Sequence, residues 1–564
     1  MIQHNGPISG VACSKSYVAT AGYDNQVILW EASGRTPISR GLHDHLANRC
    51  EISPDERYLV SASSDYTARI WKLPEMRLIT VLDGHTDDVE SARFSPDGSK
   101  VATVSQDGKV RVFEKSGALL KEFCGHVGCT QSVAWSADGS RVISSGDDGT
   151  IRTWNLSLGR EERRVQPEEV QTDAVLLAPS GVVFAGNDKG DVIRMEGDRV
   201  FRLRVHSSGV KNLCMNKEGT AIVSVSYDRK LVLIDVQKDL SVIKEMTLPS
   251  QAWARACAFL NEDTLVFGTF GSSYALLRLT TGEWDLSFIE NTSCLNALHV
   301  EKDQVFSVGD AGVVRKGSHG SNPRIETREV VSEMGSLCNF LTKYNGRLIC
   351  GGHLGKVFDA QTGREILSLQ SPINKAIQAG PYLVLATYTG KLAICEESNG
   401  GSLKLVGEFK VLENAVKDLA IDGSLVFCAG AASDLALFDL KSLKRIGHRS
   451  GAHDNIINSC VSLGDQSFAT VSRDLKLKIW KSLEEIVNLS TPFDHSIKCA
   501  AVSEDRRYIG AAAYDGRFSV FDRQAGSWSL LKRLSSSGIS SLEFSEGSFF
   551  ASSYDGWIYK VSLL

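Results

Sequence analysis

Residues 85–113 read HTDDVESARFSPDGSKVATVSQDGKVRVF, and they contain a His, an Asp 22 residues later and an aromatic residue six residues further on. Residues 43–71, 126–154 and 453–480 repeat this arrangement. A period of about 40 residues with several short strands in each copy is typical of radial or solenoid repeats. The sequence therefore predicts a repeat architecture before any chemistry is considered.

Each copy contains the signals of several short strands. In the copy quoted above, VESARFS alternates toward a turn at residues 96–98, KVATVSQ forms a second strand, and Asp107-Gly108 turns the chain into KVRVF. The following ALLKEF is a fourth strand. Four short antiparallel strands cannot bury both faces alone, so the copies must stack against each other, and in a radial arrangement they become propeller blades.

These residues resemble the WD40-repeat family. Gly84-His85 and Gly125-His126 match the Gly-His of that repeat, and Trp71, Trp154 and Trp480 match its Trp. The Asp that usually follows the Trp is replaced by Lys72, Asn155 and Lys481. The resemblance implies a β-propeller. In outline the chain is also similar to the double-propeller protein that promotes actin filament disassembly, without a match of individual residues.

The repeat can be counted along the whole chain. Along the first half of the chain, blade turns are recognised at Asp24, Asp65, Asp107, Asp148, Asp188 and Asp228, and a seventh copy without the Asp lies at 252–279. Four faint copies follow at Gly309-Asp310, 351–353, 387–390 and Ser433-Asp434. The pattern is clear again at Asp474, Asp515 and Asp555. Fourteen blades fit, and propellers run to about eight blades. We therefore expect an all-β fold of two tandem seven-bladed WD40 β-propellers with four-stranded antiparallel blades, formed by residues 1–285 and 286–564.

Two points remain open at this stage. The chain ends just after a third strand, so either one blade lacks its outer strand or the two rings exchange strands. Between residue 285 and about residue 440 the polar residues of the repeat are nearly all lost, which leaves open how regular those blades are.

The repeat contains sets of residues that look catalytic. Two of them are Ser63, His43 and Asp65, and Ser472, His453 and Asp474, which in another context would indicate a hydrolase triad. Partial copies recur at His85/Ser105/Asp107 and His206/Ser226/Asp228. Because an enzyme normally has one such site, recurrence indicates a structural network, which in the WD40 pattern joins the Asp, the His, a hydroxyl of the second strand and the Trp. We expect the copies with Gly22 and Gly146 to lack the hydroxyl of this network. The copies with Phe113, Phe521 and Ile234 are expected to lack its indole N–H.

Composition excludes several classes of function. The chain has 62 basic and 67 acidic residues, so it lacks the excess of positive charge that nucleic-acid binding requires. The sequence also contains no apolar run long enough to span a membrane. Thirteen cysteines without a secretion signal favour free thiols and a cytoplasmic location. We expect no cofactor and no metal site, and a small-molecule ligand is disfavoured. The charged residues 160–164 and the segment 316–326 are expected to be exposed loops.

The position just before the turn Asp is the best candidate for contact with partners. In WD40 proteins it lies on the upper face near the central channel. Together with Trp253, near the start of a first strand, the predicted protein-binding residues are Tyr23, Gln106, Tyr227, Trp253, Tyr388, Arg473, Tyr514 and Tyr554. Tyr and Arg anchor many protein interfaces, although Tyr is also simply a good strand-end residue.

Two classes of function follow. The first, which we favour, is a non-catalytic platform that binds one or more partner proteins through the propeller faces. Within it, a dedicated inhibitor or immunity protein that covers a toxin or enzyme, and an actin-regulating double propeller, remain alternatives. The second is a propeller enzyme with a site at a channel mouth, for which the sequence offers no unique set of catalytic residues.

Overall fold

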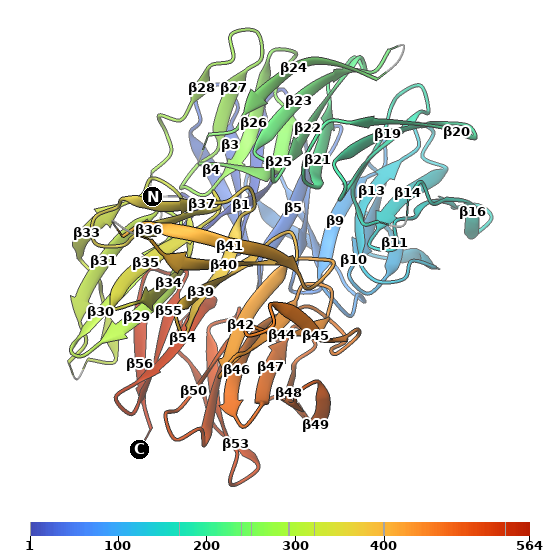
Figure 1. The fold of residues 1–564 in the computed structure, drawn as a ribbon. Helices are drawn as coiled ribbons and strands as arrows, with labels where there is room; N and C mark the ends of the chain where they lie inside the picture. Colours follow the sequence, from blue (N-terminus) through green and yellow to red (C-terminus); the bar gives the residue numbers. More distant parts are fainter. Residues whose placement is uncertain are drawn as a thin grey trace. The chain divides into compact units, whose positions relative to one another are not determined.

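The computed structural model describes residues 2–168, 170–237, 240–249, 251–290, 294–320, 322–398, 401–535 and 537–563. The chain divides into two compact units, Met1–Asn291 and Thr292–Leu564. In the described residues, both units consist of strands, turns and loops without helices, as Figure 1 shows. The strands form fourteen antiparallel sheets of four strands each.

Unit 1 contains seven of these sheets, and each sheet uses four consecutive strands. They are β1 (Ile8–Cys13), β2 (Tyr17–Gly22), β3 (Gln26–Glu31) and β4 (Pro37–Leu42); β5 (Ala47–Ile52), β6 (Tyr58–Ser63), β7 (Ala68–Lys72) and β8 (Arg77–Leu82); β9 (Val89–Phe94), β10 (Lys100–Ser105), β11 (Lys109–Glu114) and β12 (Leu119–Cys124); β13 (Thr130–Trp135), β14 (Arg141–Gly146), β15 (Ile151–Asn155) and β16 (Arg160–Val165); β17 (Thr172–Leu177), β18 (Val183–Asn187), β19 (Asp191–Glu196) and β20 (Arg199–Arg204); β21 (Val210–Met215), β22 (Ala221–Ser226), β23 (Lys230–Asp235) and β24 (Ser241–Thr247); and β25 (Ala252–Phe259), β26 (Thr264–Thr269), β27 (Ala275–Arg278) and β28 (Trp284–Asp285).

Unit 2 contains the other seven sheets. They are β29 (Leu295–Glu301), β30 (Gln304–Gly309), β31 (Val313–Ser318) and β33 (Glu329–Glu333); β34 (Cys338–Tyr344), β35 (Arg347–Gly352), β36 (Lys356–Asp359) and β37 (Glu365–Ser368); β38 (Ile373–Ala379), β39 (Tyr382–Thr387), β40 (Lys391–Glu397) and β41 (Leu403–Lys410); β42 (Val416–Asp422), β43 (Leu425–Gly430), β44 (Leu435–Asp439) and β45 (Lys444–Arg449); β46 (Ile457–Gly464), β47 (Ser467–Ser472), β48 (Lys476–Lys481) and β49 (Glu484–Ser490); β50 (Ile497–Val502), β51 (Tyr508–Ala513), β52 (Arg517–Asp522) and β53 (Ser527–Arg533); and β54 (Ile539–Ser545), β55 (Ser548–Ser553) and β56 (Ile558–Ser562) with β32 (Arg324–Ile325).

The sheets of each unit follow one another in a closed succession. In unit 1 the first strand of each sheet contacts the first strand of the next, from β1 to β25, and β25 contacts β1 again. In unit 2 the same holds from β29 to β54 and back to β29. The apolar side chains of the described residues gather between neighbouring sheets, for example between β9–β12 and β13–β16, where Val104, Phe123 and Trp154 pack together. Fourth strands such as β16, β20 and β24 lie at the outside of unit 1 (Figure 1).

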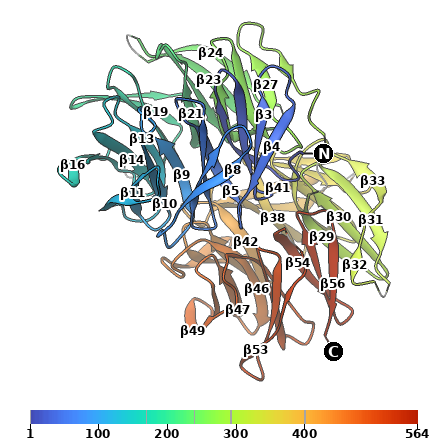
Figure 2. The ribbon, with the colours of Figure 1, turned by 180° about the vertical axis from the view of Figure 1, so that it is seen from behind.

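The two units close in different ways. Unit 1 closes through packing, because Trp30 of the first sheet packs against Val266 and Tyr274 of the last, and the His4 N–H donates to the Ser272 carbonyl at 3.0 Å. Unit 2 closes through strand pairing. Its last sheet has three consecutive strands, and the fourth is β32, which comes from the connection between β31 and β33 and lies beside β56 (Figure 2).

The prediction of a loop at residues 160–164 was wrong, and the prediction for segment 316–326 was wrong at the two ends of the segment, which are strands. Residues 160–164 belong to β16, the outermost strand of its sheet, where charged side chains alternate between exposed and half-buried positions. Segment 316–326 includes β32, and Ile325 is only 3% exposed because it packs against Leu295 and Ile558. The sheets between residues 294 and 449 have the same four-stranded order as the others, despite the loss of the polar repeat residues.

Candidate functional site

The recurring polar residues form buried networks inside single sheets. In the second sheet His43 Nδ1 lies 2.8 Å from Asp65 Oδ2, and His43 Nε2 lies 2.7 Å from Ser61 Oγ. The Trp71 indole N–H donates to the same Ser61 hydroxyl at 2.8 Å. The Ser61 hydroxyl therefore links the His43 and Trp71 rings, and His43 connects them to Asp65.

The direction of each hydrogen bond follows from Trp71 and Asp65. An indole N–H can only donate, so the Ser61 oxygen accepts from Trp71; a carboxylate can only accept, so in a neutral imidazole Nε2 is the acceptor and takes the Ser61 proton. Nδ1 of His43 then carries the ring proton and donates to Asp65. Burial is the largest single influence and raises the pKa of Asp65, but the interactions with His43, the hydrogen bond from Thr67 and the nearby charge of Arg69 together outweigh it and hold the pKa well below its usual range. The Ser hydroxyl is fully engaged and is not placed as a nucleophile.

The hydroxyl of this network was assigned wrongly from the sequence. It comes from the residue two positions before the predicted one, because the side chain that reaches both His and Trp belongs to Ser61 and not Ser63. The His-bonded hydroxyls are Thr20, Ser61, Thr103, Ser144, Ser224 and Thr470. Gly22 and Gly146 therefore do not remove the hydroxyl, since Thr20 and Ser144 supply it. Ser63 instead accepts from the Asp65 N–H at 3.0 Å and stabilises the turn.

A further member of the network was missed. Arg69, Arg111 and Arg152 sit four residues after the Asp of their sheet, and each guanidinium forms an ion pair with that Asp at 3.0–3.3 Å. The signal is present in the sequence, because the third strands read ARIW, KVRVF and IRTW with the Arg in the same place.

A second repeated feature lies at the inner edge of each sheet. Every first strand has a register shift near its start, which inserts an extra residue and redirects its side chain. The inserted residues are Ser9, Asn48, Glu90, Gln131, Asp173, Lys211, Asn296, Asn339, Asn374, Lys417, Asn458, Lys498 and Ser540, and β25 has a longer irregularity between Ala252 and Cys257.

Several of these inserted side chains bind the next sheet. Asn48 Nδ2 donates to the Val89 carbonyl at 3.0 Å, and Asn374 and Asn458 make the corresponding bonds to Val416 and Ile497 at 2.7 Å. The inserted residues therefore hold neighbouring first strands together. The end of each unit where they and the turns after the second strands meet is called its upper mouth below.

Aromatic and charged side chains meet at the upper mouth of unit 1. The Tyr23 ring makes an edge contact with Trp253, with centroids 5.2 Å apart, and Arg255 donates to the Tyr23 hydroxyl at 2.7 Å. Lys211 Nζ lies 2.6 Å from Asp188 and 5.3 Å from the centroid of the Tyr227 ring.

Carboxylates crowd the same mouth. Burial, reinforced by Asp173, Asp188 and Glu90, raises the pKa of Asp147 to about 7. Glu90 also accepts a hydrogen bond from the Gln106 side chain at 2.7 Å. This mouth therefore combines aromatic rings with more acidic than basic groups.

The upper mouth of unit 2 is basic. A pocket of about 160 Å³ there is lined by Lys375, Lys417 and Lys498 and by Tyr388 and Tyr554, together with the amides of the inserted Asn residues. Asp418 is the acidic residue of this pocket; Lys375 Nζ lies 3.7 Å from it, and its carboxylate raises the pKa of Lys375. Next to the pocket, Arg473 and Lys498 lie 5.9 and 5.5 Å from the centroid of the Tyr514 ring.

Comparison with known proteins gives these repeats a name. The family model "WD domain, G-beta repeat" matches residues 38–72, 76–114, 117–155 and 197–235. These four stretches are WD40 repeats. Each of the four stretches contains one of the His–Asp–hydroxyl networks described above.

Curated relatives carry the same repeat. The chain is 26% identical over 180 residues to the target of rapamycin complex subunit wat1 of Schizosaccharomyces pombe, covering 31% of this chain and 57% of that protein. It is 26% identical over 248 residues to a guanine nucleotide-binding protein subunit beta of Zea mays, covering 40% and 56%, and 34% identical over 105 residues to human Coronin-7, covering 17% and 11%. The match thus spans little more than half of these relatives at most. WD40-repeat proteins are in general non-enzymatic scaffolds that bind other proteins.

The predicted protein-binding residues lie at the strand ends that form the upper mouths. Seven of them directly follow the last residue of a second strand, and Trp253 is the second residue of β25. Trp253 and Tyr514 are buried, at 8% and 7% exposure, and the other six are half-buried. Their contact with a partner remains a prediction.

The sequence analysis did not predict that the inserted residues and Arg255 lie at the upper mouths. A register shift leaves no mark in the alternation of polar and apolar residues that a strand prediction uses. In the described part of the chain there is no helix of the length and apolar character that crossing a membrane requires, and no group of three metal-ligating side chains.

Proposed function

We propose that the chain is a non-catalytic platform that binds partner proteins through the upper mouths of two seven-bladed propellers, built from residues 1–285 and 286–564. The closed succession of seven four-stranded sheets in each unit supports the two rings. The internal bonding of His, Asp and hydroxyl in six of the sheets supports the absence of catalysis, since these groups are buried links and not reactive groups.

The observation that carries the proposal is the convergence of Tyr388, Tyr554, Arg473 and three Lys side chains at the upper mouth of unit 2. Aromatic and Arg side chains supply most of the binding energy at protein interfaces. Because Lys417, Lys498 and Arg473 exceed the single Asp418, we propose that an acidic segment of the partner enters this mouth. The relatives from fission yeast and maize are named as subunits of larger assemblies, which supports a binding role.

We further propose that the protein acts in the cytoplasm. All thirteen cysteines are free, and the sulfur atoms of Cys214 and Cys257 lie 3.4 Å apart without a bond. A reducing compartment keeps such a pair as thiols.

The test compares charge variants at the mouth with matched variants elsewhere. Arg473→Glu and Lys498→Glu should each weaken partner capture at least about tenfold, most strongly at low salt. The control is Lys532→Glu on the outer strand β53, which makes the same charge change on an exposed side chain. Partner capture is measured by quantitative pull-down, and folding by thermal melting. Equal capture by the mouth variants and the control, with intact folding, would refute the proposal.

A further inference from the structure

Unit 1 contains a second feature, an axial cavity of about 760 Å³. First strands of six sheets line it: β1, β5, β9, β17, β21 and β25. Its rim includes Lys15, Glu56, Lys217 and Glu262, which lie in the hairpins between first and second strands. In an antiparallel sheet these hairpins are at the opposite end from the turns after the second strands, so the cavity opens away from the upper mouth. Its volume is typical of sites for small molecules.

Three guanidinium groups line this cavity: those of Arg49, Arg93 and Arg255. Two of them have partners. Arg93 Nη1 lies 2.9 Å from Glu51 Oε1, and Arg255 bonds the Tyr23 hydroxyl and lies 3.8 Å from Glu90. In the part of the chain that the structure describes, the Arg49 guanidinium makes neither a hydrogen bond nor an ion pair.

The surroundings of Arg49 disfavour its positive charge. Burial, followed by repulsion from Arg93 and Arg255, lowers the pKa of Arg49 to about 10, and the attraction of Glu90 and Asp173 does not compensate. Arg49 is half-buried, and a partly desolvated guanidinium without a counter-charge is costly, a cost that a bound anion would reduce. Among the lining residues there are five basic and three acidic side chains, although the whole chain has a net charge of -5.

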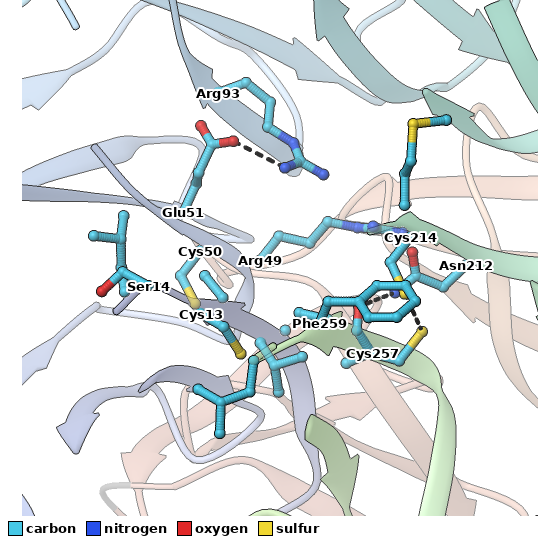
Figure 3. Close-up of a pocket in the computed structure, with 18 of the residues that line it drawn as sticks. Cys13, Ser14, Arg49, Cys50, Glu51, Arg93, Asn212, Cys214, Cys257 and Phe259 are labelled. Carbon is cyan, nitrogen blue, oxygen red and sulfur yellow. Dashed lines mark hydrogen bonds and ion pairs between the residues drawn. The ribbon is translucent and has the colours of Figure 1, made fainter. Parts of the chain in front are cut away.

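The rest of the wall is apolar or carries thiols. Figure 3 shows Arg49 and Arg93 reaching into the cavity, with Phe259 and the thiols of Cys214 and Cys257 on another side. Leu213 and Ile52 also line the cavity. This combination offers one end of a ligand a charged partner and the other end an apolar surface.

We propose that the axial cavity of unit 1 binds a small organic anion, a carboxylate or a phosphate ester with an apolar body, and that its anionic group pairs with Arg49. The planar guanidinium can bind either group with two parallel hydrogen bonds. The apolar body lies against Phe259 and Leu213. The cavity reaches Arg255, which also contacts Tyr23 at the upper mouth of unit 1, but it shares no lining residue with the pocket of unit 2 on which the partner-binding proposal rests, so the two proposals are tested independently.

Isothermal titration calorimetry on the full chain tests the proposal. The probes are phenyl phosphate and benzoate, which differ in the anionic group, and benzyl alcohol, which has the same ring without the charge. At least one of the two anions should bind with a Kd below about 1 mM, and benzyl alcohol should bind at least about tenfold more weakly. The relative affinity of the two anions tells which anionic group the site prefers.

Variants connect the binding to Arg49. Arg49→Met should weaken binding of the preferred anion at least about tenfold, whereas Arg77→Met, the same change at an exposed position of β8, should leave it unchanged. Phe259→Ala should weaken phenyl phosphate more than inorganic phosphate. If Arg49→Met does not fold by thermal melting, Arg49→Lys replaces it and should lose a smaller factor. Absence of binding by both anions, or equal binding by wild type and the Arg49 variant, would overturn the proposal.

Discussion

Ser61 and Ser63 show what a single residue decides in this fold. Both are buried, both follow the repeat, and both lie on the same face of β6 because they are two residues apart. Several copies have a hydroxyl at both positions, as in Thr103 and Ser105. The sequence spacing could therefore predict that a hydroxyl joins His and Trp, but not which one, since only the distances to the two rings distinguish them.

This difference gives a prediction at the residue scale. Ser61→Ala should lower the free energy of unfolding by about 1–3 kcal/mol, because the Trp71 N–H and His43 Nε2 would be left buried without a partner. Ser63→Ala leaves that network intact and should cost at least about 1 kcal/mol less, since the Asp65 N–H lies in a half-buried turn that water can reach. Urea unfolding of the two variants measures both values, and a larger loss for Ser63→Ala would contradict the assignment.

Asp310 gives a second prediction, on pH dependence. It is 6% exposed, and burial raises its pKa to about 7, against a usual value of 3.8. Between these values the unfolded state releases the proton and the folded state keeps it, so this residue costs stability as the pH rises from about 4 through about 7. Asp310→Asn keeps the oxygen that accepts from Asn296 and removes the titration. The variant should gain on the order of 2–4 kcal/mol at pH 8 and show little difference at pH 4.

Asp65 serves as a control, because its effect on stability depends on pH in the opposite direction. Its pKa is lowered in the folded state, so its contribution is present above its unfolded pKa and is lost as the pH falls through the folded pKa. Asp65→Asn should therefore destabilise at pH 7 and lose this effect toward acid. Free energies of unfolding from about pH 2 to pH 8 test both variants, the acid end for Asp65→Asn and the range above pH 4 for Asp310→Asn. A gain for Asp310→Asn that does not grow with pH would show that the carboxyl ionises freely in the folded state.

At the scale of elements, what the sequence predicts depends on how local the pairing is. The first three strands of a sheet are joined by short turns with Asp, Asn or Gly, so β9 to β11 could be predicted from their own residues. β32 could not, because it has two residues and its partner β56 lies more than 200 residues away in the chain. β16 was missed because a run of mixed charges resembles a solvated loop, although its edge position allows charged side chains on both faces.

The closing strand β32 gives a prediction for this scale. Ile325→Asp should destabilise the protein by about 2–5 kcal/mol, because it puts a charge among Leu295, Phe550 and Ile558. The matched control is Val330→Asp on β33, where the side chain is 46% exposed and the same change should cost less than about 1 kcal/mol. Thermal and urea unfolding give both values. Equal losses for the two variants would mean that the pairing of β32 with β56 does not hold unit 2 closed.

At the scale of the whole molecule, the chain consists of two compact units, and each closes on its own strands. A chain built in this way is expected to unfold in two transitions, one for each unit. Ser61→Ala changes only unit 1 and should lower one transition temperature, whereas Ile325→Asp changes only unit 2 and should lower the other. The double variant should show both shifts with little coupling, because the two sites share no partner. Differential scanning calorimetry of the four proteins measures this, and a single transition that moves with either variant would show that the units fold as one cooperative body.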